Sequence, residues 1–124
     1  MGEEQGRIVE AIRRLRERVR WKPGKDVVHL AKRVELGHLP MGATLADYEA
    51  LIVCIASTPA AEVFAYRWGG TAYPTVVAQV EGFRWLVMLG LDGIMETAFP
   101  PEDLETYLAN ARFTRLGTLE ELGL

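Results

Sequence analysis

Two short turns within residues 73–99 constrain the fold of this chain more than any other feature. Glu81-Gly82 and Asp92-Gly93 each lie between segments rich in β-branched and aromatic residues. Asp-Gly is a strong hairpin signal, because tight hairpin turns need the positive φ that glycine adopts freely. Consecutive strands joined in this way form an antiparallel meander. The strands that we expect are 62–68, 73–81, 83–89 and 94–99.

The residues before the meander have the spacing of helices. Ile8, Ile12, Leu15 and Val19 recur at intervals of four, three and four, which places them on one face of a helix. The helices that we expect are 7–20, 26–36, 45–57 and, after the sheet, 102–110, with one more short turn within 111–124. The sequence therefore predicts an α+β fold. It predicts a single domain over residues 1–124, with a helical part at 1–57, an antiparallel sheet at 62–99 and a short helix at 102–110.

The helix expected at 26–36 carries the candidate chemistry of the N-terminal half. Its inner, apolar stripe is expected to comprise Val27, Leu30, Ala31 and Val34. His29 and Arg33 are four residues apart and therefore share a face of this helix. Lys32 lies three residues from His29 and belongs to the same side.

The composition indicates a soluble domain with a core of its own. The chain has 124 residues, of which 49% are hydrophobic, and no apolar run approaches the length of a membrane span. Its beginning lacks the apolar region of a signal peptide. The single cysteine, Cys54, lies in an apolar run, and we expect it to be buried as a small hydrophobic residue. We therefore expect a cytoplasmic protein without a membrane partner.

Charge is distributed unevenly along the chain. Residues 1–38 hold 10 basic and 6 acidic residues, a balance of +4, whereas residues 39–124 hold 4 basic and 11 acidic residues, a balance of −7. A basic excess at one end is one footprint of a polyanion-binding surface. A solvated helix face gives the same pattern, so the charge alone leaves both interpretations open.

The sequence gives no signal for a metal or a cofactor. His29 and His38 are nine residues apart, and no convergent set of cysteines or carboxylates accompanies them. Gly69-Gly70 lacks the lysine and the following helix of a phosphate-binding loop. We expect neither a metal nor a cofactor.

The turns also predict which strand residues share a face, because a two- or four-residue loop preserves the parity of facing residues. One face is almost wholly apolar and should pack on the helices: Val76, Ala78, Val80, Phe83, Trp85, Val87, Leu89, Ile94 and Ala98, with Glu96 as a misfit at the rim. The other face is mixed: Thr75, Val77, Gln79, Arg84, Leu86, Met88, Met95, Thr97 and Phe99, joined by Tyr66. A mixed face suits a ligand site, although an outer face or a dimer face has the same pattern.

Cleaving RNA without a metal needs a base for the 2′-hydroxyl, an acid for the leaving 5′-oxygen, and donors that hold the phosphate. Histidine suits the first two tasks because it titrates near neutral pH, and arginine suits the third because its fork matches phosphate oxygens. His29 and Arg33, with Arg84 and Thr97 on the mixed face, would supply this set. Each also has an ordinary structural explanation, such as a surface histidine or an ion-paired arginine.

The order of these elements resembles a known group of nucleases. A helix with His29-x-x-Lys32-Arg33 precedes a meander whose closing strands contain Arg84-Trp85-Leu86-Val87 and Ile94-Met95-Glu96-Thr97-Ala98-Phe99-Pro100-Pro101. This arrangement is similar to the barnase–EndoU–colicin–RelE-like nuclease superfamily, especially its toxin and phage-borne branches, over about residues 25–110.

The resemblance implies a function and a set of residues. His29 would be the catalytic acid or base, Arg33 and Arg84 would bind phosphate, and Thr97 would donate a hydrogen bond to it. The residues expected to bind substrate beside them are Lys32, Tyr66, Arg67 and Gln79. The chain departs from the family pattern in lacking a delivery domain and in having an acidic second half.

Two functions from different classes follow. The first is a metal-independent endoribonuclease of toxin type, with RNA as its partner. The second is a non-catalytic interaction module, in which a protein partner or a second copy of the chain covers Met88, Met95 and Phe99.

Overall fold

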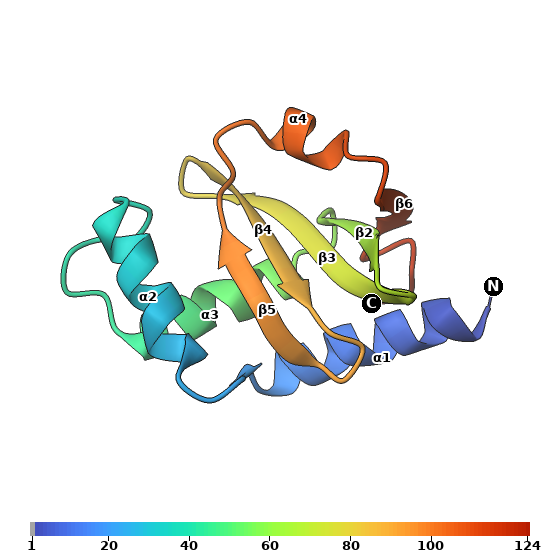
Figure 1. The fold of residues 1–124 in the computed structure, drawn as a ribbon, viewed down its shortest axis with the longest axis horizontal. Coiled ribbons are helices and arrows are strands. Elements are labelled where there is room, and N and C mark those ends of the chain that lie inside the picture. Colours follow the sequence, from blue (N-terminus) through green and yellow to red (C-terminus); the bar gives the residue numbers. More distant parts are fainter. Residues whose placement is uncertain (1) are drawn as a thin grey trace.

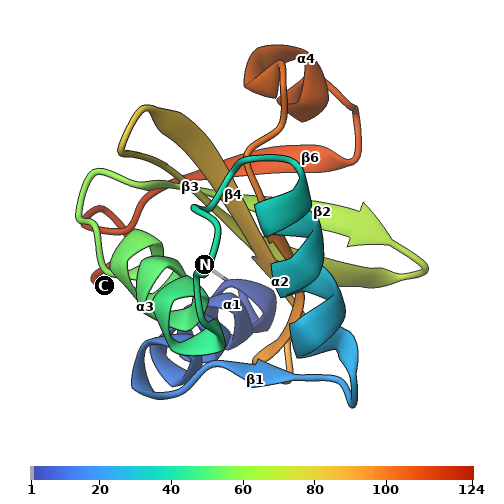
Figure 2. The same cartoon turned by 90° about the vertical axis from the view of Figure 1, so that its left-hand side faces the viewer.

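The computed structural model describes residues 2–124, which form four helices and six strands. They are α1 (Glu3–Glu17), β1 (Arg20–Trp21), α2 (Lys25–Glu35), α3 (Leu45–Ala56), β2 (Glu62–Trp68), β3 (Thr71–Val80), β4 (Phe83–Leu89), β5 (Ile94–Phe99), α4 (Leu104–Leu108) and β6 (Phe113–Thr118). The strands form one sheet in the order β1-β5-β4-β3-β2-β6. Helices α1 and α3 lie on one side of the sheet, α2 stands at its β5 end, and α4 lies on the opposite side (Figures 1 and 2).

The α+β class is confirmed. The four expected strands pair antiparallel in chain order, but the sheet has six strands and is mixed, because one further strand is added at each edge. Helix α1 ends at Glu17 and not at residue 20, since Arg18 has an extended backbone with φ −161° and ψ 130°. The chain then pairs β1 in parallel with the start of β5. At the other edge β6 pairs antiparallel with β2, in a segment where only a short turn was expected.

The main core lies between the sheet and the two helices α1 and α3. Its largest fully buried side chains include Trp85, Tyr48, Ile12 and Leu15. The stripe expected on the first helix is therefore buried, apart from Val19, which is half-buried beyond the helix end. Cys54 is exposed, contrary to expectation, because only one side of α3 faces α1 and the sheet.

A smaller core covers part of the opposite face of the sheet. It contains Phe64, Val77, Leu86, Met88 and Leu104. Helix α4 supplies Leu104, and the rings of Tyr107 and Phe113 lie 5.7 Å apart over the same face. Much of the mixed face is thus covered by the chain's own C-terminal segment, so a partner is not needed there to cover Met88.

A β-bulge changes the parity of strand β5. Met88 faces Thr97, but the next residue along β4, Leu89, faces Met95, so that Glu96 is the extra residue. Met95 therefore joins the main core at 1% exposure, and its expected place on the mixed face is wrong. Thr97 stays on the mixed face with Met88, as the turns predict.

The first tight turn has the expected geometry. Glu81 and Gly82 both have positive φ, 49° and 86°, as a type I′ hairpin turn requires. Strands β3 and β4 accordingly pair in register from Val80 and Phe83 to Thr75 and Met88. Of the helices within residues 2–124, none has the length and apolar character needed to cross a membrane.

Candidate functional site

Helix α2 buries an arginine and leaves two valines exposed to solvent. Arg33 is 7% exposed and is the one buried residue of this helix, whereas Val27 and Val28 are each 59% exposed. The apolar stripe expected here is wrong for Val27 and Ala31, which face solvent, while Leu30 and Val34 are half-buried. Burying a cation while leaving valines in water costs free energy. Such a conflict between pattern and structure is typical of a functional site.

Two side chains contact the guanidinium of Arg33, and neither is a carboxylate. Its Cζ lies 5.6 Å from the centre of the Phe99 ring, and its Nη1 donates to Nδ1 of His38 at 3.3 Å. Its Nε is buried without a hydrogen-bond partner. Within residues 2–124 no acidic side chain forms an ion pair with Arg33. Burial lowers the pKa of Arg33, yet an arginine stays protonated in proteins, so the site holds a buried cation that lacks a counter-ion.

Arg33 lines an open groove between α2 and the exposed part of β5. The groove has a volume of about 630 Å³ and is lined by Val28, His29, Ala31, Lys32, Arg33, Glu35, Thr97 and Phe99. Helix α2 can flank β5 here because the two residues of β1 cover only Ile94 and Met95 of that edge. Three of the four expected catalytic residues, His29, Arg33 and Thr97, therefore lie in one groove, together with Lys32.

The surroundings of His29 favour its neutral form. Burial lowers the pKa of His29, and the positive charges of Arg33 and Lys25 lower it further, against a smaller opposing effect of Glu96. The ring lies 5.6 Å from the Trp21 ring, centre to centre, with 31° between the planes. A neutral imidazole at neutral pH has a free nitrogen lone pair and is able to accept a proton.

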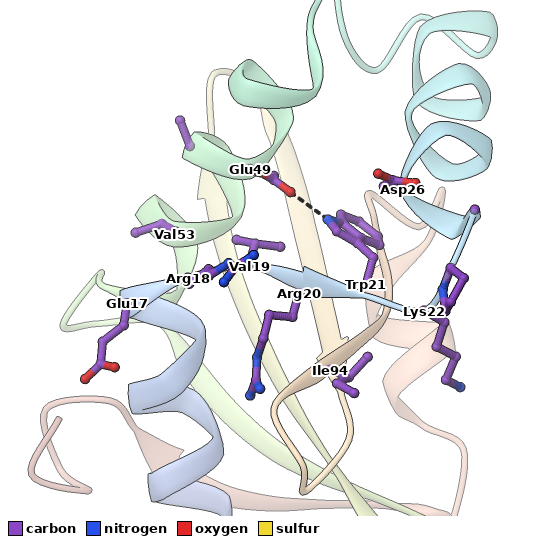
Figure 3. A pocket seen from close by; sticks show the side chains of 13 residues that line it. Glu17, Arg18, Val19, Arg20, Trp21, Lys22, Asp26, Glu49, Val53 and Ile94 are labelled. Atoms are coloured by element: carbon purple, nitrogen blue, oxygen red, sulfur yellow. Dashed lines mark hydrogen bonds between the residues drawn. The ribbon is translucent and has the colours of Figure 1, made fainter.

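Trp21 links the groove to the main core. Its indole Nε1 donates to Glu49 of α3 at 2.8 Å (Figure 3). Its ring lies 5.6 Å from the ring of Tyr48 on the same helix. The two-residue strand β1 thus fixes the Trp21 ring in the position where it packs against the His29 ring.

A larger hollow of about 870 Å³ opens beside Trp21 and is the pocket drawn in Figure 3. Two of its three basic residues already have partners: Arg20 donates to the carbonyl of Asp92 at 3.0 Å, and Lys22 pairs with Glu96 at 2.7 Å. It also contains the carboxylates of Glu17, Asp26 and Glu49. Because it combines both signs of charge with no orphaned buried group, the hollow is a weaker candidate than the α2–β5 groove.

Arg84 is not brought into the groove. Met88 faces Thr97, and Arg84 lies four residues further along β4, a distance of about 14 Å for a strand. Arg84 pairs there with Glu105 of α4. Gln79 is the direct cross-strand partner of Arg84, so it too lies at this far end of the sheet.

Tyr66 and Arg67 lie near the end of β2 and do not line the groove. Tyr66 lines a hollow of about 340 Å³ with Trp68, Tyr73, Met88 and Glu96. Met88 of this hollow is the cross-strand partner of Thr97, which lines the groove. Arg67 pairs with Glu4 at 2.9 Å.

Several residues of the site were not singled out for it by the sequence. Trp21 follows the expected end of the first helix, and nothing in the sequence shows that it would form a separate strand and contact His29. His38 was not proposed as a site residue, and its contact with Arg33 depends on the loop that follows α2. The described part of the chain contains no group of three or more histidine, cysteine or acidic side chains placed to hold a metal ion.

Comparisons of the chain with models of protein families, with curated proteins and with solved structures gave no significant match.

Proposed function

We propose that the groove between α2 and β5 binds a phosphodiester of RNA and that His29 catalyses cleavage of the RNA there. The observation that carries the proposal is the buried guanidinium of Arg33, which has no carboxylate partner and lines the same groove as His29 and Thr97. A phosphate would supply the missing negative charge. Arginine forms its strongest hydrogen bonds with such anions.

The chemistry follows from the charge states of these groups. Neutral His29 takes the proton from the 2′-hydroxyl, and the 2′-oxygen then attacks phosphorus. The bond from phosphorus to the 5′-oxygen breaks, and that oxygen is protonated by solvent, leaving a 2′,3′-cyclic phosphate. Arg33 and Lys32 offset the charge that builds on the phosphate oxygens, with Thr97 as a hydroxyl donor. The reaction needs no redox change and no co-reactant other than water.

The test is to incubate the purified protein with RNA in EDTA and to analyse the fragment ends. The proposal expects fragments that end in 2′,3′-cyclic phosphate, and it expects that His29→Ala abolishes them. His38→Gln is the matched control, because His38 does not line the groove and glutamine retains an acceptor for Arg33. Intact RNA, or equal loss of cleavage in both variants, would contradict the role of His29.

A second candidate is a non-catalytic interaction module, and one observation favours it. Of the seven large hydrophobic side chains that are exposed among residues 2–124, four lie between positions 27 and 41: Val27, Val28, Leu36 and Met41. Exposed apolar groups that gather in one segment often mark a contact surface. If the chain is such a module, it forms a stable dimer or complex. Replacing Val27 and Val28 by serine should then dissociate that assembly. A monomer at high concentration, measured by light scattering, argues against self-association.

A further inference from the structure

The exposed indole of Trp68 lies at the end of β2, outside the proposed cleavage groove. Trp68 is 54% exposed, whereas Trp85 is 1% exposed and Trp21 is half-buried. The guanidinium of Arg112 lies 4.4 Å from the centre of the Trp68 ring. An exposed indole with an arginine stacked on it is a flat, apolar and positively charged surface.

Trp68 lines two adjoining hollows, and only one of them contains Arg112. That hollow, of about 380 Å³, also includes Glu4, Arg67 and Gly70. The other, of about 340 Å³, is lined by Tyr66, Trp68, Tyr73, Met88 and Glu96. Tyr66 and Tyr73 face each other across β2 and β3. The second hollow therefore presents aromatic rings and a thioether, surfaces on which a flat ring stacks.

We propose that this place is a subsite for single-stranded nucleic acid, in which a base stacks on Trp68 and Arg112 binds a neighbouring phosphate. The proposal rests on the proposed RNA cleavage for its setting, but it concerns a different set of residues. Arg112 is suited to the role because no carboxylate within residues 2–124 pairs with it, whereas Arg67 is already paired with Glu4.

The geometry connects this subsite to the groove. Trp68 faces Thr71 of β3, and Thr75, four residues further along, faces Met88, which in turn faces Thr97. Four residues along a strand and three strand spacings separate Trp68 from Thr97 by about 20 Å. A strand of several nucleotides is needed to span that distance, so a bound chain must leave the groove unpaired and extended over the sheet.

A cationic ligand is a poorer fit for the same rings. Aromatic cages bind quaternary ammonium groups, and Glu96 would complement such a charge. Arg112, however, already places a positive charge on the Trp68 ring, and Glu96 is already paired with Lys22. The anionic strand is therefore the occupant that the charges favour.

Stacking does not read the 2′-hydroxyl, so the subsite should accept DNA as well as RNA. Single-stranded DNA has no 2′-nucleophile, and the proposed reaction leaves it intact. It should therefore bind as a competitive inhibitor of RNA cleavage.

The experiment titrates the protein into a dye-labelled oligodeoxythymidine of about ten nucleotides and follows the fluorescence anisotropy of the dye, which does not depend on the tryptophans. We expect binding that weakens as salt is raised, because phosphate contacts release counter-ions. Trp68→Ala should weaken binding at least about fivefold, and Trp68→Phe, which keeps an aromatic ring, should restore most of it. Arg112→Ala should weaken binding and lower its salt dependence. Phe83→Ala is the control, since Phe83 is a comparably placed aromatic at the far end of the sheet with 39% exposure.

Unchanged affinity in Trp68→Ala, equal binding of a duplex, or equally effective competition by polyglutamate would each overturn the subsite. The two proposals fail separately. RNA cleavage that is unaffected by Trp68→Ala and by the DNA would remove the subsite and leave the cleavage proposal standing. DNA binding at Trp68 without any cleavage of RNA would remove the cleavage proposal and leave the subsite standing.

Discussion

The guanidinium of Arg33 lies 5.6 Å from the centre of the Phe99 ring, on the side of the sheet where β5 meets α2. The contact joins the one buried residue of α2 to the last residue of β5, and it gives a cation a partner without giving it a counter-charge. Four predictions follow from this relationship and from the groups around it.

Replacing Arg33 by methionine should separate stability from function. Methionine is apolar and of similar length, and exchange of a buried charged group for an apolar one is often neutral or stabilising. We expect the free energy of unfolding to stay equal or to rise by about 1 kcal/mol, while RNA cleavage is lost. Urea denaturation and a cleavage assay on the same sample measure both. Arg115→Met, at an exposed arginine paired with Glu62, is the control. A large loss of stability with retained cleavage would assign Arg33 a structural role.

Acid should destabilise the protein through its two histidines. Burial lowers the pKa of both His29 and His38, and Arg33 lowers each further. As the pH falls through the ordinary histidine pKa of about 6.5, the unfolded chain takes up protons that the folded chain resists. Stability is therefore full above that pH and falls below it. We expect a lower urea midpoint at pH 5 than at pH 7.5, and a smaller drop in His38→Gln. An equal drop in the wild type and the variant would contradict the argument for His38.

The pattern of residues that the sequence did and did not predict has a physical cause. Strands β2, β4 and β5 have the expected bounds, because local alternation and the turns at Gly82 and Gly93 define them. Strand β1 was missed, since two residues form a strand only through a distant partner. The bulge at Glu96 leaves no local signal, so Met95 was assigned to the wrong face.

The orientation of α2 also depends on distant residues. Its own sequence favours an apolar stripe through Val27 and Ala31. The helix pattern cannot show that Trp21 contacts His29 and that Phe99 contacts Arg33 on a different side of the helix. His29, Arg33 and Thr97 were named from their chemistry, and the fold places them in one groove. Arg84 was named for the same reason, but register along β4 keeps it apart.

Arg84→Ala should leave RNA cleavage unchanged. Arg84 pairs with exposed Glu105 at the far end of the sheet, and exposed ion pairs contribute little to stability. We therefore expect no measurable change in the unfolding midpoint or in the cleavage rate. Loss of cleavage in a folded Arg84→Ala protein would show that the substrate reaches this end, and it would place Arg84 back among the phosphate-binding residues.

Tyr48→Phe should loosen the support behind the groove. The buried hydroxyl of Tyr48 donates to the carbonyl of Ala98 on β5 at 2.5 Å, and burial raises the pKa of this phenol, which therefore stays protonated. Loss of the hydroxyl should lower the free energy of unfolding by about 1–2 kcal/mol. Tyr107→Phe, at a more exposed tyrosine, is the control and should change it little. Equal effects in the two variants would mean that the bond to Ala98 contributes nothing specific.

The central claim is that a phosphodiester occupies the groove of Arg33 and His29. The most direct measurement is nuclear magnetic resonance of the Arg33 Nε–H and the His29 imidazole during titration with a 2′-O-methyl RNA oligonucleotide, which the proposed reaction leaves uncleaved. The account predicts that both signals shift in proportion to occupancy and that Arg33→Met abolishes the shift at His29. Saturable binding that moves neither signal would contradict it.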